Sequence, residues 1–435
     1  MTPSERILGK VLARTITRGT LAISWSDGSR STFGTTTPGF PDVAARMLDD
    51  RVARDTLTDM RLGFAEAFMD GRVVIEQGDI LALVELARRN SPWDEGRDLS
   101  PPSIFRQLRQ RLGHYAHSFN RPDKSRKNVA HHYDIGNGLY QLMLDEEHMQ
   151  YSCAYWDTER FGEDMTLGQA QEAKLAHIAA KLNLRPGLRV LDIGSGWGGM
   201  AIFLAQRARV EVLGITLSEE QLALARERAE AAGVADRVRF ELLDYRVLAD
   251  RKEQFDRIVS VGMFEHVGQP QFTTFFRACA RLLTEDGTML LHTIGRMGSP
   301  SRTDAFTDKW IFPGGYIPAL SETVAASEKV RLIAADVETL RLHYARTIRE
   351  WYARVVEHRD AIIAMHDERF YRLWTFYLAG AATSFESGAM CNYQIQYVRN
   401  RRALPFTRNY MADAERALLS GPAGPEPVRA AETIR

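Results

Sequence analysis

The chain has 435 residues, which is enough for two or three domains and a sizeable hydrophobic core. Its composition, 45% hydrophobic and 26% charged, is that of a globular protein and is too apolar for a disordered one. Basic and acidic residues balance at 56 each, so the whole molecule is not built to bind a polyanion. No segment approaches 18 uninterrupted apolar residues, and we expect no transmembrane helix.

The cysteines are few and far apart. Cys153, Cys279 and Cys391 form no CxxC pair, which argues against a structural zinc site or a disulfide framework, and we expect no metal. Cys279 lies in a helical pattern and is expected in the core. A sparse, odd count fits a reducing compartment, and residues 1–6 lack the layout of a signal peptide. We therefore expect a cytoplasmic protein.

Residues 1–90 predict a small α+β domain. The pattern indicates a strand, a turn, two helices and a tight connection, in that order, at 21–25, 26–29, 41–49, 60–69 and 69–72. No set of residues in this domain forms a convincing catalytic site. Residues 90–103 are rich in proline, serine and charged residues, which is typical of a linker.

A basic stretch stands out in the otherwise neutral chain. Residues 101–130 carry seven arginines and lysines against one acid, Asp123, for a net charge of +6. Apolar residues recur at helical spacing in its first half, so we expect a basic amphipathic helix. Three interpretations stay open: a solvated helix face docked on its neighbour, contact with anionic lipid headgroups, or binding of nucleic acid, which no recognition motif supports.

From about residue 187 the pattern alternates between strands and helices. Short apolar runs predict strands at 188–193, 210–215, 238–242, 255–260 and 288–293. A helix is expected at 218–232, and residues 344–386 are helical and rich in aromatics. Strands separated by helices of about 10–15 residues indicate an α/β fold with a mainly parallel, doubly wound, Rossmann-like sheet.

The first of these strands runs into a glycine-rich loop. Gly194, Ser195 and Gly196 open the run GSGWGG, whose glycines allow a tight turn and close approach of a ligand to the backbone. The run satisfies the pattern GxGxxG, so a nicotinamide cofactor is one interpretation. Asp192, inside the strand, instead suits the ammonium group of S-adenosylmethionine, which is the cofactor we expect.

The ends of the next two strands favour the same cofactor. The second strand lacks the acidic residue that takes ribose hydroxyls in dinucleotide-binding domains. Polar groups are available there in its place, and a polar cluster after the third strand suits contact with the adenine end. These residues are Thr216, Ser218 and Gln221 on the second strand end, and Asp244, Tyr245 and Arg246 on the third.

Further runs occur in order across residues 125–410: HYDIGN (132–137), MQYSCAYW (149–156), GITLS (214–218), GMFEHVG (262–268), LHTIG (291–295), FPGG (312–315) and HY (343–344). With the glycine loop, they make the chain resemble the bacterial cyclopropane-fatty-acyl-phospholipid synthases, relatives of the mycolic-acid cyclopropane synthases. Residues 1–100 match more loosely, like the small accessory domain of the full-length bacterial enzymes. Tyr151, Ser152 and Leu217 in these runs complete the expected cofactor set.

The resemblance implies methyl transfer from S-adenosylmethionine to a cis double bond in a phospholipid acyl chain, followed by closure of a cyclopropane ring. Methylation of an alkene leaves a carbocation, so the site needs a dry pocket, electron-rich walls and a base that is not itself methylated. The resemblance implies bound bicarbonate as that base. Its expected cradle is Cys153, Glu265, His292, the backbone of Ile294, and Tyr344. The aromatic residues near these motifs are Tyr133, Tyr151, Tyr155, Trp156, Phe264, Tyr316 and Tyr344.

Each of these residues also has a plainer interpretation. His292 at a strand end fits a structural histidine, and Cys153 fits an inert buried thiol. Glu265 with His266 fits a charge pair at a helix start. At least half of the aromatic residues are expected to be ordinary core.

Two departures from the family pattern are informative. Ser195 stands where many relatives carry cysteine, and serine keeps the small size and the backbone contact. Ala381 also stands where many relatives carry cysteine, so no thiol nucleophile acts from this position. Cys391, ten residues on, is not an obvious substitute. A direct transfer assisted by bicarbonate does not need the missing cysteine.

The sequence thus predicts a two-lobed methyltransferase that binds an anionic membrane surface peripherally on the cytoplasmic side of the inner membrane. Unsaturated phospholipid is the expected substrate, nucleic acid is not expected, and a homodimer is compatible with the resemblance. The expected boundaries are 1–90 for an accessory domain, 91–125 for the linker and basic helix, 126–415 for the catalytic domain, and 416–435 for a disordered tail.

Three other functions remain open at this stage. The first is a synthase of methyl- or methylene-branched fatty acids on the same scaffold. The second is a methyltransferase for small molecules such as amines. The third is a non-catalytic lipid-binding protein, which would need a broken catalytic position.

Overall fold

The computed structural model describes residues 1–96 and 136–421. The basic stretch, Tyr133 and the tail from residue 422 lie outside the described residues, so the predictions made for them stay predictions. The described residues form two compact units. The small unit holds 1–96, 303–313 and 345–390, and the large unit holds 136–302, 314–344 and 391–421. Within these residues, no helix has both the length and the apolar character needed to cross a bilayer.

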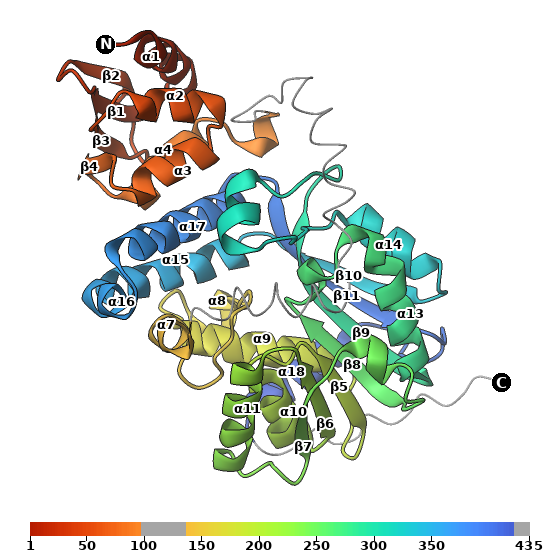
Figure 1. Cartoon of the computed structure of the whole chain (residues 1–435). Helices are drawn as coiled ribbons and strands as arrows, with labels where there is room; N and C mark the ends of the chain where they lie inside the picture. Colours follow the sequence, from red (N-terminus) through yellow and green to blue (C-terminus); the bar gives the residue numbers. More distant parts are fainter. Residues whose placement is uncertain (97–135, 422–435) are drawn as a thin grey trace. The chain divides into compact units, whose positions relative to one another are not determined.

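The small unit contains a four-stranded sheet in the order β2-β1-β3-β4. Strand β1 is antiparallel to β2 and parallel to β3, and β3 is antiparallel to β4. The predicted strand at 21–25, the turn, the helix at 60–69 and the tight connection are confirmed. The elements up to residue 96 (Figure 1) are α1 (Pro3–Thr15), β1 (Gly19–Ser24), β2 (Arg30–Thr35), β3 (Asp42–Met47), α2 (Arg51–Thr58), α3 (Leu62–Met69), β4 (Val73–Gln77), α4 (Ile80–Arg89) and η1 (Trp93–Glu95).

The helix predicted at 41–49 is wrong, because these residues form strand β3. Val43, Ala45 and Met47 are buried and the residues between them are more exposed, which is the period-two pattern of a strand. On its two sides β3 pairs with β1 and β4. Pairing with strands elsewhere in the chain therefore overrides the helix propensity of this alanine-containing segment.

The helices predicted at 344–386 are confirmed as α15 (His343–Glu357), α16 (Arg359–Met365) and α17 (Glu368–Glu386). Phe376 of α17 packs against Phe64 and Phe68 of α3, with ring centroids 6.1 and 6.3 Å apart. Phe306, just before the π-helical turn η4 (Thr307–Ile311), meets the same ring at 5.0 Å. This aromatic core joins three distant segments of the chain into the small unit.

The large unit contains a seven-stranded sheet in the order β10-β11-β9-β8-β5-β6-β7. The neighbours from β7 to β9 are parallel, and β10 and β11 are antiparallel, so the sheet is mixed but mainly parallel. The α/β fold class and the predicted strands are confirmed. The strands are β5 (Arg189–Ile193), β6 (Glu211–Thr216), β7 (Val238–Leu242), β8 (Phe255–Val261), β9 (Leu283–Arg296), β10 (Ile333–Leu340) and β11 (Met390–Val398).

Helices cover both faces of this sheet (Figure 1). Val190 and Val212 pack with α9, α10, α11 and α18, whereas Leu191 and Leu213 pack on the other face with α13 and α14. Because both faces are buried, the strands are continuous apolar runs, which made them predictable. The helices and short turns are α7 (Asn137–Met143), α8 (Thr158–Phe161), α9 (Leu167–Lys181), α10 (Gly199–Ala208), α11 (Glu219–Ala231), α12 (Tyr245–Leu248), η2 (Phe264–His266), η3 (Gln269–Gln271), α13 (Phe272–Leu282), α14 (Leu320–Glu328) and α18 (Asn409–Leu419).

Strands β10 and β11 and helix α18 are among the elements that were not predicted. Strand β10 exposes most of its residues, and β11, which lies between β10 and β9, buries the polar residues Asn392, Gln394 and Gln396. Neither pattern matches the apolar run expected of a strand buried on both faces. Helix α18 extends to Leu419, so residues 416–419 are helical although they were expected in the tail.

Candidate active site

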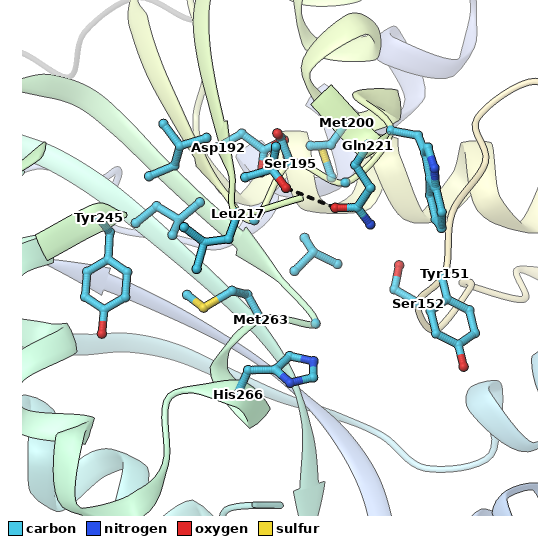
Figure 2. Close-up of a pocket in the computed structure, with 18 of the residues that line it drawn as sticks. Tyr151, Ser152, Asp192, Ser195, Met200, Leu217, Gln221, Tyr245, Met263 and His266 are labelled. Carbon is cyan, nitrogen blue, oxygen red and sulfur yellow. Dashed lines mark hydrogen bonds between the residues drawn. The ribbon is translucent and has the colours of Figure 1, made fainter. Parts of the chain in front are cut away.

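A pocket of about 1120 Å³, including the part open to solvent, lies at the carboxyl ends of strands β5 to β8. In doubly wound sheets this is the edge at which ligands bind. All of the predicted cofactor residues except Ser218 line it. Figure 2 shows Tyr151 and Ser152 on one side of the pocket and Tyr245 on the opposite side. The structure therefore brings together polar residues that are up to 95 positions apart in the chain.

The glycine loop turns from β5 into α10 beside this pocket. Gly194, Gly196 and Gly198 have φ angles of 85°, 53° and 81°, in the left-handed region that favours glycine. The carbonyl of Ile215 at the end of β6 accepts hydrogen bonds from the amides of Gly194 and Ser195 at 2.9 and 3.0 Å. The loop is thus held to the neighbouring strand, with its backbone facing the pocket.

Asp192 is a buried carboxyl group at the end of β5, 2% exposed. Its Oδ2 has no hydrogen-bond partner, and neither does Oγ of the nearby loop residue Ser195. Burial raises the pKa of Asp192 to about 7, although the positive charge of Lys174 opposes this shift. An unpaired buried acceptor is costly, and a cation beside it removes that cost. The free oxygens of Asp192 and Ser195 therefore fit the cationic methionine end of S-adenosylmethionine.

The end of β6 is organised by Gln221. Oγ1 of Thr216 donates to Oε1 of Gln221 at 3.0 Å, the dashed contact in Figure 2. Ser218 is the N-cap of α11, and its Oγ accepts from the backbone of Gln221 at 3.3 Å. Ser218 does not line the pocket, so it supports Gln221 from behind.

The end of β7 combines an ion pair with an aromatic ring. Asp244 accepts from Nε of Arg246 at 2.9 Å and from its Nη2 at 2.6 Å. Tyr245 between them is mostly buried and packs edge-on against Phe275, with ring centroids 5.3 Å apart. At the end of β7 the ring of Tyr245 thus offers a flat apolar surface beside the ion pair of Asp244 and Arg246. This combination suits a purine.

Two side chains of α9 hold the pocket wall formed by residues 149–152. Nε2 of Gln171 donates to the carbonyl of Ser152 at 3.0 Å. Nζ of Lys174 donates to Oγ of Ser152 at 3.1 Å and to Oε1 of Gln150. Lys174 is fully buried, and burial lowers its pKa to about 7. Sequence reasoning missed Lys174, because lysine on a helix is ordinarily a surface residue.

We expect Lys174→Met to raise KM for S-adenosylmethionine by about five- to tenfold, since a typical lost hydrogen bond costs about 1 kcal/mol. Methionine keeps the length of the side chain but cannot donate to Ser152 or Gln150. Initial rates over a range of cofactor concentrations measure the effect. Lys309→Met removes a half-exposed lysine paired with Glu66 and is the control. An unchanged KM in Lys174→Met would contradict a positioning role for this lysine.

Gly199 at the start of α10 leaves room for the same wall. A Cβ on Gly199 would lie 2.0 Å from the carbonyl oxygen of His148. We expect Gly199→Ala to cost about 1–3 kcal/mol of stability, as overpacking does, and to weaken cofactor binding by displacing the wall. Gly380→Ala in α17 is the control, since its Cβ would meet nothing within 4 Å. Thermal denaturation compares the two, and equal melting temperatures would refute the expectation.

Glu265 lies in the turn η2 between the pocket residues Met263 and His266. Its Oε1 accepts a hydrogen bond from the backbone amide of Ile294 on β9 at 2.5 Å, and its buried Oε2 has no partner. Burial raises the pKa of Glu265 to about 7. The carboxyl can therefore change its protonation near neutral pH. The backbone of Ile294, which was expected to hold bicarbonate, donates its N–H to Glu265 in this structure.

The other expected cradle residues are also buried. His292 lies two residues before Ile294 on β9, and burial together with the charges of Lys174 and Lys181 lowers its pKa well below the usual value. Cys153 donates to the carbonyl of Ala154 at 3.3 Å, and burial raises the pKa of its thiol, which keeps it neutral. Tyr344 is buried at the start of α15.

The expected aromatic residues divide between the pocket and the core. Tyr151 lines the pocket, whereas Phe264 stacks on Phe272 with ring centroids 4.3 Å apart inside the core of the large unit. Tyr155 is stacked between His177 and His343, at 4.1 and 5.0 Å. These last two positions agree with the plainer interpretation of aromatic residues as structural packing.

Several pocket residues were not predicted as part of the site. They are Met149, Gln150, Trp197, Met200, Leu243, Met263 and His266, with aliphatic neighbours. Trp197 and His266 could have been predicted from the sequence, because Trp197 lies inside the glycine loop and His266 inside the GMFEHVG run. The others are apolar or generic side chains, and only the folded chain places them at the pocket.

The comparisons with known proteins agree on one family. Residues 120–395 match the family model described as mycolic acid cyclopropane synthetase. A cyclopropane-fatty-acyl-phospholipid synthase of Escherichia coli strain K12 is 38% identical over 346 residues, covering 79% of this chain and 84% of that protein. A probable fatty acid methyltransferase of Pseudomonas putida is 40% identical over 292 residues, covering 65% of this chain and 73% of that protein.

A solved structure extends the likeness to the fold. The mycolic acid cyclopropane synthase CmaA1, complexed with SAH and CTAB, superposes with a TM-score of 0.58 and 34% identity, over 62% of this chain and 97% of that one. The sequence runs, the pocket at the strand ends and these likenesses point the same way. This chain belongs to the mycolic acid cyclopropane synthetase family of S-adenosylmethionine-dependent methyltransferases, which includes the cyclopropane-fatty-acyl-phospholipid synthases.

Proposed function

We propose that this enzyme transfers a methylene carbon from S-adenosylmethionine to the cis double bond of an unsaturated phospholipid acyl chain, forming a cyclopropane ring. The family supports an acyl substrate, since the relatives are named for phospholipid and fatty acid modification. In the reaction, the alkene carbon bonds to the methyl carbon as the carbon–sulfur bond breaks. The resulting carbocation closes the ring when the former methyl group loses a proton.

The observation that carries the proposal is the free oxygen of Glu265. Proton loss from carbon needs an acceptor close to the cofactor, inside a site that excludes water. Oε2 of Glu265 is buried and has no partner, and Glu265 directly precedes His266, a residue of the cofactor pocket. A carboxyl group whose pKa is raised to about 7 is half ionised at neutral pH and suits proton transfer.

Bicarbonate fits part of this arrangement. When bound, it would supply a proton acceptor. Oε2 of Glu265 could accept a hydrogen bond from a protonated oxygen of such an anion, and the buried imidazole of His292 could donate to another. Cys153 would contact such an anion only as a neutral thiol, and Tyr344 could add a hydroxyl.

A methyl- or methylene-branched product is the second candidate. The Pseudomonas putida relative is named a probable fatty acid methyltransferase, and the same carbocation can lose a different proton. Purified enzyme is incubated with S-adenosylmethionine, bicarbonate and vesicles of a cis-monounsaturated phospholipid, and the acyl chains are analysed by mass spectrometry and proton NMR. A gain of CH₂ with loss of the olefinic signals supports cyclopropanation. A gain of CH₂ with an olefinic signal retained supports the second candidate, and no gain refutes both.

The basic stretch supports peripheral binding of the protein to the bilayer surface. We propose that this binding takes place on the cytoplasmic face of the inner membrane. Its net charge of +6 favours anionic headgroups, each basic residue near the surface contributing about 1 kcal/mol. The small unit would assist this docking, and a homodimer would present two such surfaces.

Reversing the charge of Arg106, Arg109, Lys124 and Lys127 to glutamate is expected to weaken binding to anionic vesicles by at least tenfold. Sedimentation with vesicles measures the effect, and high salt should weaken the wild type in the same way. Neutral vesicles serve as the control. Unchanged vesicle binding and turnover would leave the stretch as an ordinary surface segment.

A further inference from the structure

A network of buried polar side chains connects Glu338 on β10 with the candidate catalytic residue His292. Nζ of Lys181 on α9 contacts Oε2 of Glu338 on β10 and donates to Oε1 of Gln394 on β11 at 2.8 Å. Nε2 of Gln394 lies 3.1 Å from Nδ1 of His292 on β9. Lys181, Gln394 and His292 are each at most 2% exposed, so water does not compete for these contacts.

The direction of each hydrogen bond in this network follows from the ammonium group of Lys181. An ammonium group only donates, so the atom of Gln394 that faces Lys181 must be its carbonyl oxygen. Burial opposes ionisation of Glu338, yet hydrogen bonding to His177 and the charges of His177 and Lys181 hold the pKa of Glu338 below its usual value. Burial lowers the pKa of Lys181, and the charge of Glu338 and its hydrogen bond oppose this shift, so the ion pair favours the ammonium form of Lys181.

The orientation of the amide then sets the proton on the imidazole. With its oxygen turned to Lys181, Gln394 presents only N–H groups to Nδ1 of His292, which must accept. Burial and the charges of Lys174 and Lys181 lower the pKa of His292 well below its usual value, so the ring carries a single proton. That proton is on Nε2.

Asn392 provides a second, independent indication. Its Nδ2 lies 3.5 Å from Nε2 of His292, while its own buried Oδ1 has no partner. Exchanging the amide oxygen and nitrogen by rotation about the last side-chain torsion would turn Oδ1 toward the N–H on Nε2 and give this buried acceptor a partner, which favours the same tautomer. At 3.5 Å this contact is at the outer limit of a hydrogen bond, so an anion bound closer to Nε2 can replace it.

We propose that Lys181 and Gln394 are positioning residues that hold His292 in the Nε2–H form, so that it serves the methyl-transfer site as a hydrogen-bond donor and not as a base. This inference rests on the proposed function for its consequence in turnover. A ring whose Nδ1 is occupied and whose Nε2 is already protonated has no lone pair free for the proton lost from carbon. The proton acceptor must then be Glu265 or an anion to which His292 donates.

The tautomer can be read directly, without turnover. Protein labelled with ¹⁵N in its 11 histidines gives proton–nitrogen correlation spectra in which the two neutral tautomers have distinct nitrogen shifts. The signals of His292 are those absent from a His292→Asn sample. We expect the Nε2–H pattern in the wild type. An Nδ1–H pattern or a protonated ring at neutral pH would overturn the proposal.

Gln394→Glu is designed to reverse the tautomer. Its carboxylate can accept from Lys181 with one oxygen and from Nδ1–H of His292 with the other, so Nε2 loses its proton. We expect an Nδ1–H spectrum and a fall of kcat by about 100-fold, the cost of losing one donor to an oxyanion. KM for S-adenosylmethionine should stay within about twofold of the wild-type value, because no residue of this hydrogen-bond network lines the cofactor pocket.

The matched control is Gln396→Glu on the same strand. Gln396 is equally buried and donates to the carbonyl of Lys181 and to the hydroxyl of Tyr410, without touching His292. It should leave the His292 spectrum in the wild-type pattern. If Gln394→Glu leaves the tautomer unchanged, the proposal is wrong. If it does not fold, the wild-type spectrum still decides the tautomer. Failure of the lipid assay with an Nε2–H spectrum would instead refute the proposed reaction alone.

Discussion

Replacing Glu265 by glutamine is expected to lower kcat by about 10²–10⁴-fold, the range that loss of a general base costs. Glutamine keeps the size of the side chain, and its amide oxygen can still accept from the backbone amide of Ile294. It cannot take up a proton at neutral pH. Turnover is measured as release of S-adenosylhomocysteine in the presence of phospholipid vesicles, and cofactor binding should stay near the wild-type value.

The pH dependence of the wild type tests the same group. Burial raises the pKa of Glu265 to about 7, so the ionised form that accepts a proton predominates above this pH and is lost below it. We therefore expect kcat to fall as the pH drops through about 7, and this dependence to vanish in Glu265→Gln. Glu241→Gln, on the surface of β7 beside Arg251, is the control. Wild-type turnover in Glu265→Gln would exclude the glutamate as a proton acceptor.

Asp192→Asn is expected to raise the dissociation constant of S-adenosylmethionine by about 10- to 100-fold. A hydrogen bond to a charged group contributes about 1.5–3 kcal/mol, and the unpaired oxygen of this buried carboxyl suits a cation. Isothermal titration calorimetry measures the change. Asp256→Asn, near the start of β8, where the carboxylate accepts from the backbone of Arg189, should leave binding unchanged.

Binding of the cofactor should also depend on pH through Asp192. Burial raises the pKa of this carboxyl to about 7, so the free protein increasingly carries the neutral acid as the pH falls below that value. A cation favours the ionised form, and affinity should therefore fall with the pH in the wild type and stay flatter in Asp192→Asn. Equal affinities of the two proteins at pH 8 would show that Asp192 does not contact the charged end of the cofactor.

Much of the pocket was predictable because its residues follow directly after strands. Asp192 and the glycine loop are contiguous in the chain, and the positive φ angles of Gly194 and Gly196 are what a tight turn into α10 requires. Thr216 is the last residue of β6 and Asp244 follows β7, and the carboxyl ends of parallel strands meet at one edge of the sheet. Local order and one topological rule were therefore sufficient to assemble this part of the site.

The sequence by itself determined the α/β class, the central parallel strands, the glycine loop and the family resemblance. These depend on apolar runs and on motifs contiguous in the chain. Only the tertiary structure decided that residues 41–49 form a strand, because the pairing partners of β3 lie elsewhere in the chain. It also placed Lys174 under the pocket wall and put buried amides on β11, between β10 and β9. A polar residue in the interior is stable only with its partners, and the partners Lys181, Gln394 and His292 come from three different elements.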